Sequence, residues 1–254
     1  MNNKLYTSKD GSTTIFNAEI NQYYHNPNGA VSESLHIFFG VSGLIDFLES
    51  AKSLTILEVG FGTGLNFLLL LDLYQKRELN FPVRFFSIEA FPLEQETAKK
   101  LDFTGHLQNP ELNKLLPKIF SELESGYNHI KPIEHLDVEL HLFFGNFADF
   151  TIQNLHADFI FHDPFSPEVN KELWTAETFI KLKNYSSENA VLATYCSASK
   201  ARAAMAASGW FVARAPGTLG KREMTLASLD ETKLLEFKRV NEQKLAERYR
   251  EGDF

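Results

Sequence analysis

The sequence has 254 residues, of which 44% are hydrophobic and 23% are charged, and these values are typical of a globular chain with one large domain. The formal net charge of −8 excludes a protein that coats nucleic acid by bulk positive charge, but it leaves room for a local basic patch. A single cysteine, Cys196, excludes an internal disulfide, and no apolar run reaches the roughly 18 residues of a membrane-spanning helix. The N-terminus lacks an apolar signal-peptide core, so we expect a cytoplasmic protein.

Residues 1–45 are expected to form a cap that precedes the core. Residues 13–16 suit a short strand, an Asn-Pro-Asn-Gly turn follows, and the apolar spacing of residues 31–48 predicts a helix. Two interpretations of this segment stay open. It covers one edge of the sheet, or it also places Tyr23, Tyr24 and Glu33 over a ligand pocket.

A glycine-rich loop joins the first predicted core strand, residues 54–59, to a long apolar helix over residues 65–79. The loop contains Gly60, Gly62 and Gly64, which allow sharp turns and bring bare backbone next to a ligand. The following helix start offers unpaired N–H groups and a partial positive charge. We therefore predict that a small molecule binds here, the alternative being a glycine-rich turn without a ligand.

The spacing of these glycines indicates the class of ligand. The dinucleotide fingerprint is G-x-G-x-x-G, whereas here the glycines alternate and follow Glu58. This E-x-G-x-G-x-G pattern resembles the first motif of Rossmann-like S-adenosylmethionine-dependent methyltransferases. The resemblance implies that the methionine part of the cofactor lies along the loop near Glu58, and we include Asn66, just after the glycines, in the expected cofactor site.

Three further polar residues follow predicted strands. Glu89 ends the strand at residues 83–90 and is expected to accept hydrogen bonds from ribose hydroxyls, unless it is an ordinary solvated acid. Asn146 follows the strand at residues 138–144 and either accepts a hydrogen bond from the adenine amino group or is a turn residue. Asp163 follows the strand at residues 157–162, where α/β sheets bind ligands, although it would also serve as a helix cap.

The remaining chain completes an alternating β/α pattern. Helices are expected at residues 94–101, 171–183 and 200–207, with helices and loops over 102–133, a strand at 189–196, and an antiparallel pair at 210–213 and 224–229. Ser197 or Ser199 is expected to cap the helix at 200–207. Residues 46–229 are thus predicted as an α/β core with a doubly wound, mostly parallel sheet and an antiparallel last strand. Residues 230–254 are expected to be a mixed-charge helix with a solvated face, within a single domain.

Several stretches together resemble one family. GFGTGLNFL, IEAFPL, DPFSP, ELWT, LATYCSA and GKREM, spread over residues 60–224, are similar to the MnmC/MnmD tRNA (5-methylaminomethyl-2-thiouridine) methyltransferases. The resemblance implies a Rossmann-like class I fold, S-adenosyl-L-methionine as cofactor, and methylation of the 5-aminomethyl group of the wobble (2-thio)uridine of a tRNA partner. The sequence has no room for the oxidase domain that follows in bifunctional MnmC, so we expect the stand-alone methyltransferase form.

Carried over by position, the resemblance makes Asp163 the catalytic carboxylate beside the cofactor. Asn146 departs from the aspartate that is usual in the family, and Pro164 stands where glycine is common, so that the loop resembles the D-P-P-Y motif of amine methylases. The expected substrate-binding residues are Tyr24, Glu33, Pro164, Phe165, Lys221 and Arg222.

Lys221 and Arg222 lie on a glycine-containing loop, where they either pair with tRNA phosphates or form an ordinary solvated hairpin. The scattered histidines form no metal motif, and a cofactor that carries its own electrophile requires no metal. Two other functions stay open. One is a methyltransferase for a small amine or a protein, and the other is a non-catalytic module that keeps the cofactor fold as a scaffold.

Overall fold

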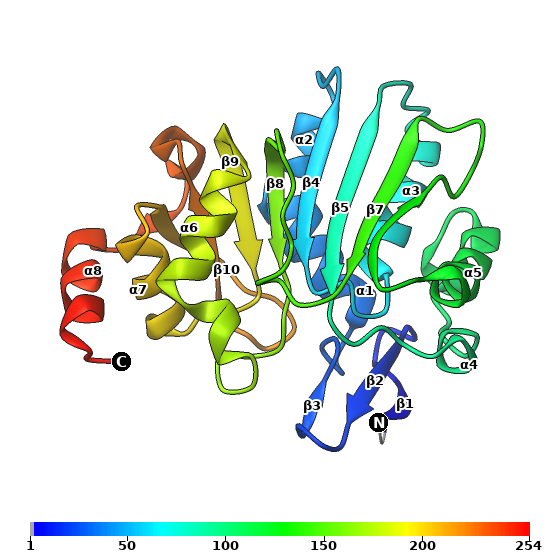
Figure 1. Ribbon diagram of the computed structural model, residues 1–254, viewed down its shortest axis with the longest axis horizontal. Coiled ribbons are helices and arrows are strands. Elements are labelled where there is room, and N and C mark those ends of the chain that lie inside the picture. Colours follow the sequence, from blue (N-terminus) through cyan, green and yellow to red (C-terminus); the bar gives the residue numbers. More distant parts are fainter. Residues whose placement is uncertain (1–2) are drawn as a thin grey trace.

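The computed structural model describes residues 3–254, which form a small three-stranded sheet and a large nine-stranded sheet with helices on both faces. The large sheet has the order β12-β10-β11-β9-β8-β4-β5-β7-β6. Figure 1 shows the small sheet below the carboxyl ends of the long central strands. This arrangement places the N-terminal residues over the sheet edge where α/β proteins bind ligands.

The centre of the large sheet is parallel. Its strands are β4 (Leu54–Val59), β5 (Val83–Glu89), β7 (Val138–Phe144), β8 (Ala157–His162) and β9 (Ser186–Thr194), and neighbours pair in parallel in the order β9-β8-β4-β5-β7. The chain moves from β4 through β5 to β7, and then returns to β8 on the other side of β4. The strand order therefore reverses between the paired strands β4 and β8. In α/β sheets the loops on either side of such a switch point form a ligand-binding crevice.

Both edges of the sheet are antiparallel. The strand β11 (Glu223–Ser228) lies between β9 and β10 (Phe211–Pro216) and opposes both, as predicted for the last core strand. The short strand β12 (Lys238–Arg239) extends this edge. The opposite edge is β6 (Gly126–Ile130), which was expected to be loop or helix. Its sequence GYNHI lacks an apolar run, and it is a strand because β7 pairs with it.

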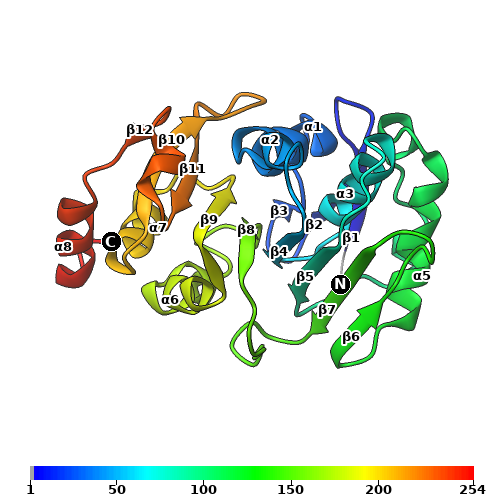
Figure 2. The ribbon, with the colours of Figure 1, turned by 90° about the horizontal axis from the view of Figure 1, so that it is seen from above.

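Two hydrophobic clusters lie on the two faces of the sheet. One face is covered by α1 (Ala30–Ser34), the π-helix η1 (Leu35–Val41), α2 (Leu44–Phe47), α3 (Leu65–Lys76) and α5 (Leu115–Glu122), and the other by α6 (Ala176–Asn184) and α7 (Ser199–Ala207). Figure 2 shows these two groups on opposite sides of the sheet. The shorter elements are β1 (Asn3–Thr7), β2 (Thr13–Asn17), β3 (Gln22–Tyr23), α4 (Gln95–Ala98), α8 (Glu242–Glu251) and the 3₁₀ turns η2 (Thr104–His106), η3 (Pro110–Lys114), η4 (Lys171–Trp174) and η5 (Glu231–Leu234).

Three expectations for helices were wrong in detail. The continuous helix over residues 31–48 is broken into α1, η1 and α2, the last break being Gly43 with φ +82°. The helix over residues 230–254 is shorter, because η5 and β12 precede α8, whose first turn is capped by the side chain of Asn241. The helix α7 has Ala198 at its N-cap and no side-chain cap, so neither serine has the expected role.

Candidate active site

A cleft of about 1090 Å³ opens at the carboxyl ends of β4, β5, β7 and β8. Its wall includes most of the predicted site residues: Tyr24, Glu33, Gly60, Gly62, Glu89, Asn146, Asp163, Pro164, Phe165 and Lys221. Ligand pockets usually have volumes of about 300–1,000 Å³, so this cleft has room for more than one small group. Within residues 3–254, the predicted site residues outside its lining are Glu58, Gly64, Asn66 and Arg222.

The three loop glycines are required for different structural reasons. All have positive φ, at 95°, 55° and 78° for Gly60, Gly62 and Gly64. A Cβ at Gly60 would lie 2.8 Å from the carbonyl oxygen of Asp163, and one at Gly64 would lie 2.7 Å from Cδ2 of Leu116. A Cβ at Gly62 would make only an ordinary 3.5 Å contact with Tyr24, in the cleft. Gly60 and Gly64 therefore serve close packing, and Gly62 leaves backbone open to a ligand.

The carboxylate of Glu89 ties β5 to the glycine loop. Its Oε2 accepts a 2.8 Å hydrogen bond from the Gly62 N–H, and its Oε1 accepts one of 2.8 Å from Phe91 N–H. Burial raises the pKa of Glu89, while these backbone donors oppose the rise. Each oxygen retains a lone pair, so Glu89 is able to accept further hydrogen bonds from a ligand in the cleft.

A buried polar group lies beneath the loop. Glu58 is 1% exposed, and its carboxylate accepts hydrogen bonds from Asn66 Nδ2 at 2.9 Å and Ser87 Oγ at 2.6 Å. Burial raises the pKa of Glu58 to about 8, against the opposing effect of these two donors. The structure thus places Glu58 and Asn66 behind the glycine loop, where they support its shape, and not in the cleft wall.

Asp163 connects this buried group to the cleft. Its N–H donates to the Val59 carbonyl at 3.0 Å, which continues the β4–β8 pairing, and its Oδ2 lies 3.4 Å from Asn66 Nδ2. Burial raises the pKa of the Asp163 carboxyl well above its usual range, and the charges of Glu58 and Glu33 add to this effect. The Asp163 carboxylate therefore binds a proton more strongly than the carboxylate of an ordinary aspartate does.

An ion pair lies in the lining of the cleft. Lys221 Nζ is 2.8 Å from Glu33 Oε1 and 4.6 Å from the centre of the Tyr195 ring. Asn26 Nδ2 donates to the same Glu33 oxygen at 3.0 Å, and Tyr195 donates its hydroxyl to the Pro164 carbonyl at 2.8 Å. Lys221 is thus engaged inside the cleft, whereas Arg222 is exposed on the hairpin outside it.

Some cleft residues were not predicted. Tyr195 directly follows β9, which ends at Thr194, whereas the sequence predicted a strand as far as residue 196 and so did not mark Tyr195 as a strand-end residue. Gln22 and His25 lie in the N-terminal segment, and nothing in their local sequence indicated their partners. Gln22 Nε2 donates to Ser166 Oγ at 2.6 Å, and His25 Nε2 lies 2.7 Å from Thr63 Oγ1. These contacts connect the cap to the loop after β8 and to the glycine loop.

The cleft also has an aromatic side. The rings of Tyr24 and Phe165 meet edge to face, with centroids 5.0 Å apart. Burial and the charge of Glu89 raise the pKa of Tyr24 to about 12, and burial lowers the pKa of His25 to about 4. Both side chains are therefore neutral near pH 7, which suits contact with a planar, uncharged ring.

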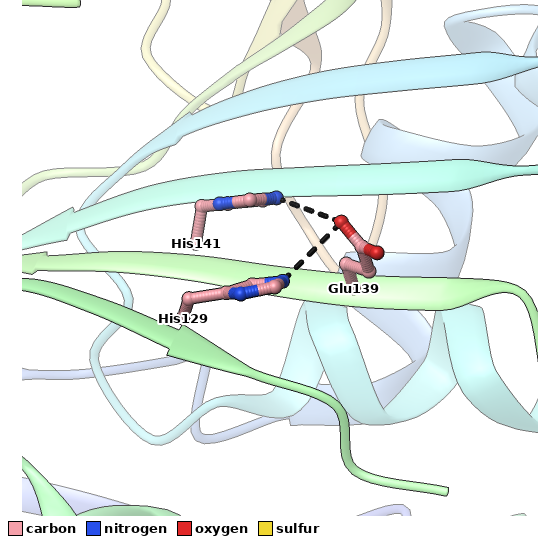
Figure 3. Close-up of side chains that lie close together, drawn as sticks. All are labelled: His129, Glu139 and His141. Atoms are coloured by element: carbon pink, nitrogen blue, oxygen red, sulfur yellow. Dashed lines mark hydrogen bonds and ion pairs between the residues drawn. The ribbon is translucent and has the colours of Figure 1, made fainter. Parts of the chain in front are cut away.

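A separate cluster lies on the outer strands β6 and β7 (Figure 3). His129 and His141 face each other across the strand pair, and their Nε2 atoms lie 3.3 and 3.2 Å from the same oxygen of Glu139. Their rings are stacked at 4.6 Å and 10°. The contacts are a hydrogen bond between His141 and Glu139 and an ion-pair contact from His129, and these residues do not line the cleft.

Comparison with known proteins bears on the chemistry of the cleft. Residues 108–230 match the family described as "S-adenosyl-L-methionine-dependent methyltransferase". This match supports an S-adenosyl-L-methionine-dependent methyltransferase activity for the chain. The predicted cofactor class is thereby confirmed.

The relatives are MnmC proteins, as the sequence motifs indicated. The chain is 32% identical over 206 residues to the "tRNA 5-methylaminomethyl-2-thiouridine biosynthesis bifunctional protein MnmC" of Leptospira borgpetersenii serovar Hardjo-bovis (strain JB197), covering 79% of this chain and 31% of that protein. It is also 32% identical over 228 residues to MnmC of Azoarcus sp. (strain BH72), covering 87% of this chain and 34% of the relative. The chain therefore spans about a third of the length of these relatives and is homologous to their methyltransferase part.

Solved structures confirm the methyltransferase fold. MNMC2 from Aquifex aeolicus superposes with a TM-score of 0.75 at 24% identity, covering 96% of this chain and 80% of that one. Spermidine synthase from Thermotoga maritima has the same fold at 13% identity, with a TM-score of 0.53, covering 89% of this chain and 72% of the other. Within residues 3–254, none of the helices is long and apolar enough to cross a membrane.

Proposed function

We propose that this methyltransferase transfers a methyl group to the 5-aminomethyl nitrogen of the wobble (2-thio)uridine in tRNA, in the cytoplasm. The names of the MnmC relatives support this substrate. The observation that carries the proposal is the place of Asp163, a basic carboxylate in the cleft wall directly beside the glycine loop. An amine acceptor needs such a group, because it must lose a proton.

The cleft residues fit S-adenosyl-L-methionine. Gly62 leaves open backbone at the cleft, Glu89 has lone pairs for ribose hydroxyls, and Asn146 lines the end of β7, where adenine would lie. When bound, the cofactor supplies a methyl group on a positively charged sulfonium. The buried Glu58 and Asn66 would act on this site indirectly, by holding the glycine loop.

The acceptor amine must be neutral to react. With a lysine-like pKa of ~10.4 as an upper bound, its deprotonation at pH 7 costs up to about 5 kcal/mol. Asp163 would accept an N–H hydrogen bond, direct the nitrogen lone pair and take up the surplus proton. Its raised pKa reduces the mismatch with the amine, and Lys221 and Glu33 are placed to set the local charge.

The aromatic side of the cleft suits the base that carries the amine. Tyr24 and Phe165 present neutral apolar surfaces, and Pro164 keeps the loop after Asp163 rigid. Single-stranded and loop bases of RNA are commonly held against such aromatic side chains. We therefore assign these three residues to the wobble base.

The test is the variant Asp163→Asn, which keeps the shape of the side chain and removes its basicity. Methyl transfer to tRNA that bears 5-aminomethyl-2-thiouridine should fall by about 10²–10⁴-fold, while binding of the cofactor stays within a few-fold of the wild type. Nucleoside mass spectrometry of the tRNA measures the product. The matched control is Glu168→Gln, an exposed acid on the same loop, which should retain full activity. An active Asp163→Asn enzyme would contradict the role of Asp163.

A small amine or a protein is the alternative acceptor, and the net charge of −8 favours it. Incubation with labelled cofactor separates the two functions when modified tRNA, polyamines and peptides are offered in parallel. Label in the tRNA supports the proposal, and label confined to the amines or peptides refutes it.

A further inference from the structure

A small basic groove lies at the edge of the large sheet, away from the cleft. It has a volume of about 270 Å³ and lies between β10, β12 and α8, which Figure 2 shows at one end of the molecule. Its lining consists of Arg214, Lys238, Arg239, Val240, Asn241, Lys244, Leu245 and Arg248. Five of these side chains are cationic and, among the described residues that line it, none is acidic.

The fold brings Arg214 next to four cations of the segment 238–248. Arg214 on β10 is paired directly with Lys238 on β12, and Lys244 and Arg248 lie one turn apart on α8. The repulsion between like charges opposes such a cluster, and the protein as a whole is acidic. Carboxylates next to the groove offset the charge of its three arginines, so the positive charge left for a negatively charged ligand is mainly that of Lys238 and Lys244.

Carboxylates hold the arginines from outside the groove. The ion pairs, at 2.6 to 3.7 Å, are Arg239–Glu242, Arg248–Asp253, Arg239–Glu231 and Arg214–Glu223. A guanidinium group has five N–H donors, so each arginine keeps donors for a second partner. Lys238 and Lys244 are exposed, and within residues 3–254 neither lies within ion-pair distance of a carboxylate.

The groove is connected to the cleft by one hairpin. Arg214 is two residues before the end of β10, and the loop that follows carries Lys221 into the cleft. At about 3.3 Å per residue, Arg214 lies only on the order of 10 Å from the start of that loop. A polyanion with one residue in the cleft thus passes close to the groove.

We propose that this basic groove binds backbone phosphates of the tRNA while the wobble nucleoside occupies the cleft. The inference rests on the proposed tRNA substrate and adds the surface that an acidic enzyme uses to hold it. Arginine and lysine bind phosphate by charge-assisted hydrogen bonds, and such contacts give affinity without reading sequence. The groove is a tRNA anchor and takes no part in the methyl transfer.

The test is a double variant, Lys238→Gln with Lys244→Gln, measured with modified tRNA at several salt concentrations. The KM for tRNA should rise about 10-fold, with kcat unchanged. The slope of log Kd against log salt should fall by about 1.4–1.8, since each of the two lysine–phosphate contacts contributes about 0.7–0.9. Cofactor affinity should not change.

The matched control is Lys99→Gln with Lys114→Gln, two exposed lysines elsewhere that already pair with Glu96 and Glu111. It removes the same charge and should leave the KM and the salt slope at wild-type values. A groove variant with wild-type KM and slope overturns the inference, as does an equal loss in the control. A wild-type enzyme that does not methylate tRNA overturns the proposed function instead, so the two failures are distinguishable.

Discussion

Gly60 and Gly62 are two positions apart, yet replacing them should cost different amounts of folding free energy. Both have positive φ, which disfavours any side chain by about 1 kcal/mol. At Gly60 a methyl group would also press on the backbone of Asp163 at 2.8 Å, whereas at Gly62 it meets the edge of the Tyr24 ring at 3.5 Å. One glycine therefore keeps β4 and β8 close, and the other keeps the cleft open.

Gly60→Ala should lower the free energy of unfolding by about 2–4 kcal/mol, and Gly62→Ala by about 1 kcal/mol. Denaturant unfolding of the two variants measures this difference. Gly62→Ala should still weaken cofactor binding, because its new methyl group lies at the cleft wall. Equal destabilisation by the two changes would contradict the packing role assigned to Gly60.

Glu58 makes stability depend on pH. Its folded pKa of about 8 lies above its ordinary value of 4.5, so between these values the folded protein holds a proton that the unfolded chain has released. This contribution to stability is present below pH 4.5 and is lost as the pH rises toward 8. The expected loss between pH 5 and pH 8 is on the order of 3 kcal/mol.

Glu58→Gln removes this titration and keeps the hydrogen-bonding shape. Relative to the wild type, the variant should gain melting temperature as the pH rises from 5 to 8, which thermal unfolding at several pH values measures. The exposed control Glu49→Gln should follow the wild-type profile throughout. A Glu58→Gln profile parallel to the wild type would show that Glu58 titrates normally.

Among the elements, the small sheet β1–β2–β3 and the residues after it are connected to the cleft loops by two side-chain contacts. The amide of Gln22, on β3, pairs with Ser166 through both of its polar atoms, at 2.6 and 3.3 Å. His25 supplies the second connection, to Thr63 in the glycine loop. The cap and the two cleft loops are thereby coupled, so a ligand that orders one of them orders the others.

Gln22→Ala should remove one of these two connections at a cost of about 1–2 kcal/mol. We expect residues 22–25 and 163–166 of the variant to exchange amide hydrogens faster than in the wild type. Binding of the cofactor should slow this exchange in the variant again. The control Gln243→Ala, on the exposed face of α8, should leave these segments unchanged. Unchanged exchange in Gln22→Ala would mean that the contact between Gln22 and Ser166 does not hold the cap on the cleft loop.

On the scale of the whole molecule, ligand binding and stability are linked through the cleft. The cleft lies between loops that follow β4, β5, β7 and β8, so a molecule bound there connects the two halves of the sheet. A ligand that binds only the folded state at 100 times its Kd stabilises it by about 2.7 kcal/mol. The cleft is thus a site from which the cofactor stabilises the entire domain.

S-adenosyl-L-methionine at that concentration should raise the melting temperature by roughly 5–10 °C, as expected for a chain of this size. Differential scanning fluorimetry measures the shift. Asp163→Asn should show a shift close to that of the wild type, and Gly62→Ala a smaller one at the same concentration. The absence of any shift in the wild type would mean that the cofactor does not bind the folded protein at that concentration.

The sequence alone determined the central parallel sheet, the glycine loop and the strand ends that carry Glu89, Asn146 and Asp163. These features depend on local apolar runs and on backbone requirements, which are written in consecutive residues. Its motifs also indicated the family. The strand β6 was missed because its polar residues become a strand only through pairing with β7.

Only the tertiary structure decided the surroundings of the site. It placed Glu58 and Asn66 beneath the glycine loop, paired Lys221 with Glu33 across 188 positions of sequence, and gathered the cations of β10, β12 and α8 into one groove. Burial and charge pairing depend on which distant segments meet, and no local pattern records that. For the same reason, the raised pKa of Asp163 follows from its burial and from the charges of Glu58 and Glu33 near it in space, and not from its neighbours in the chain.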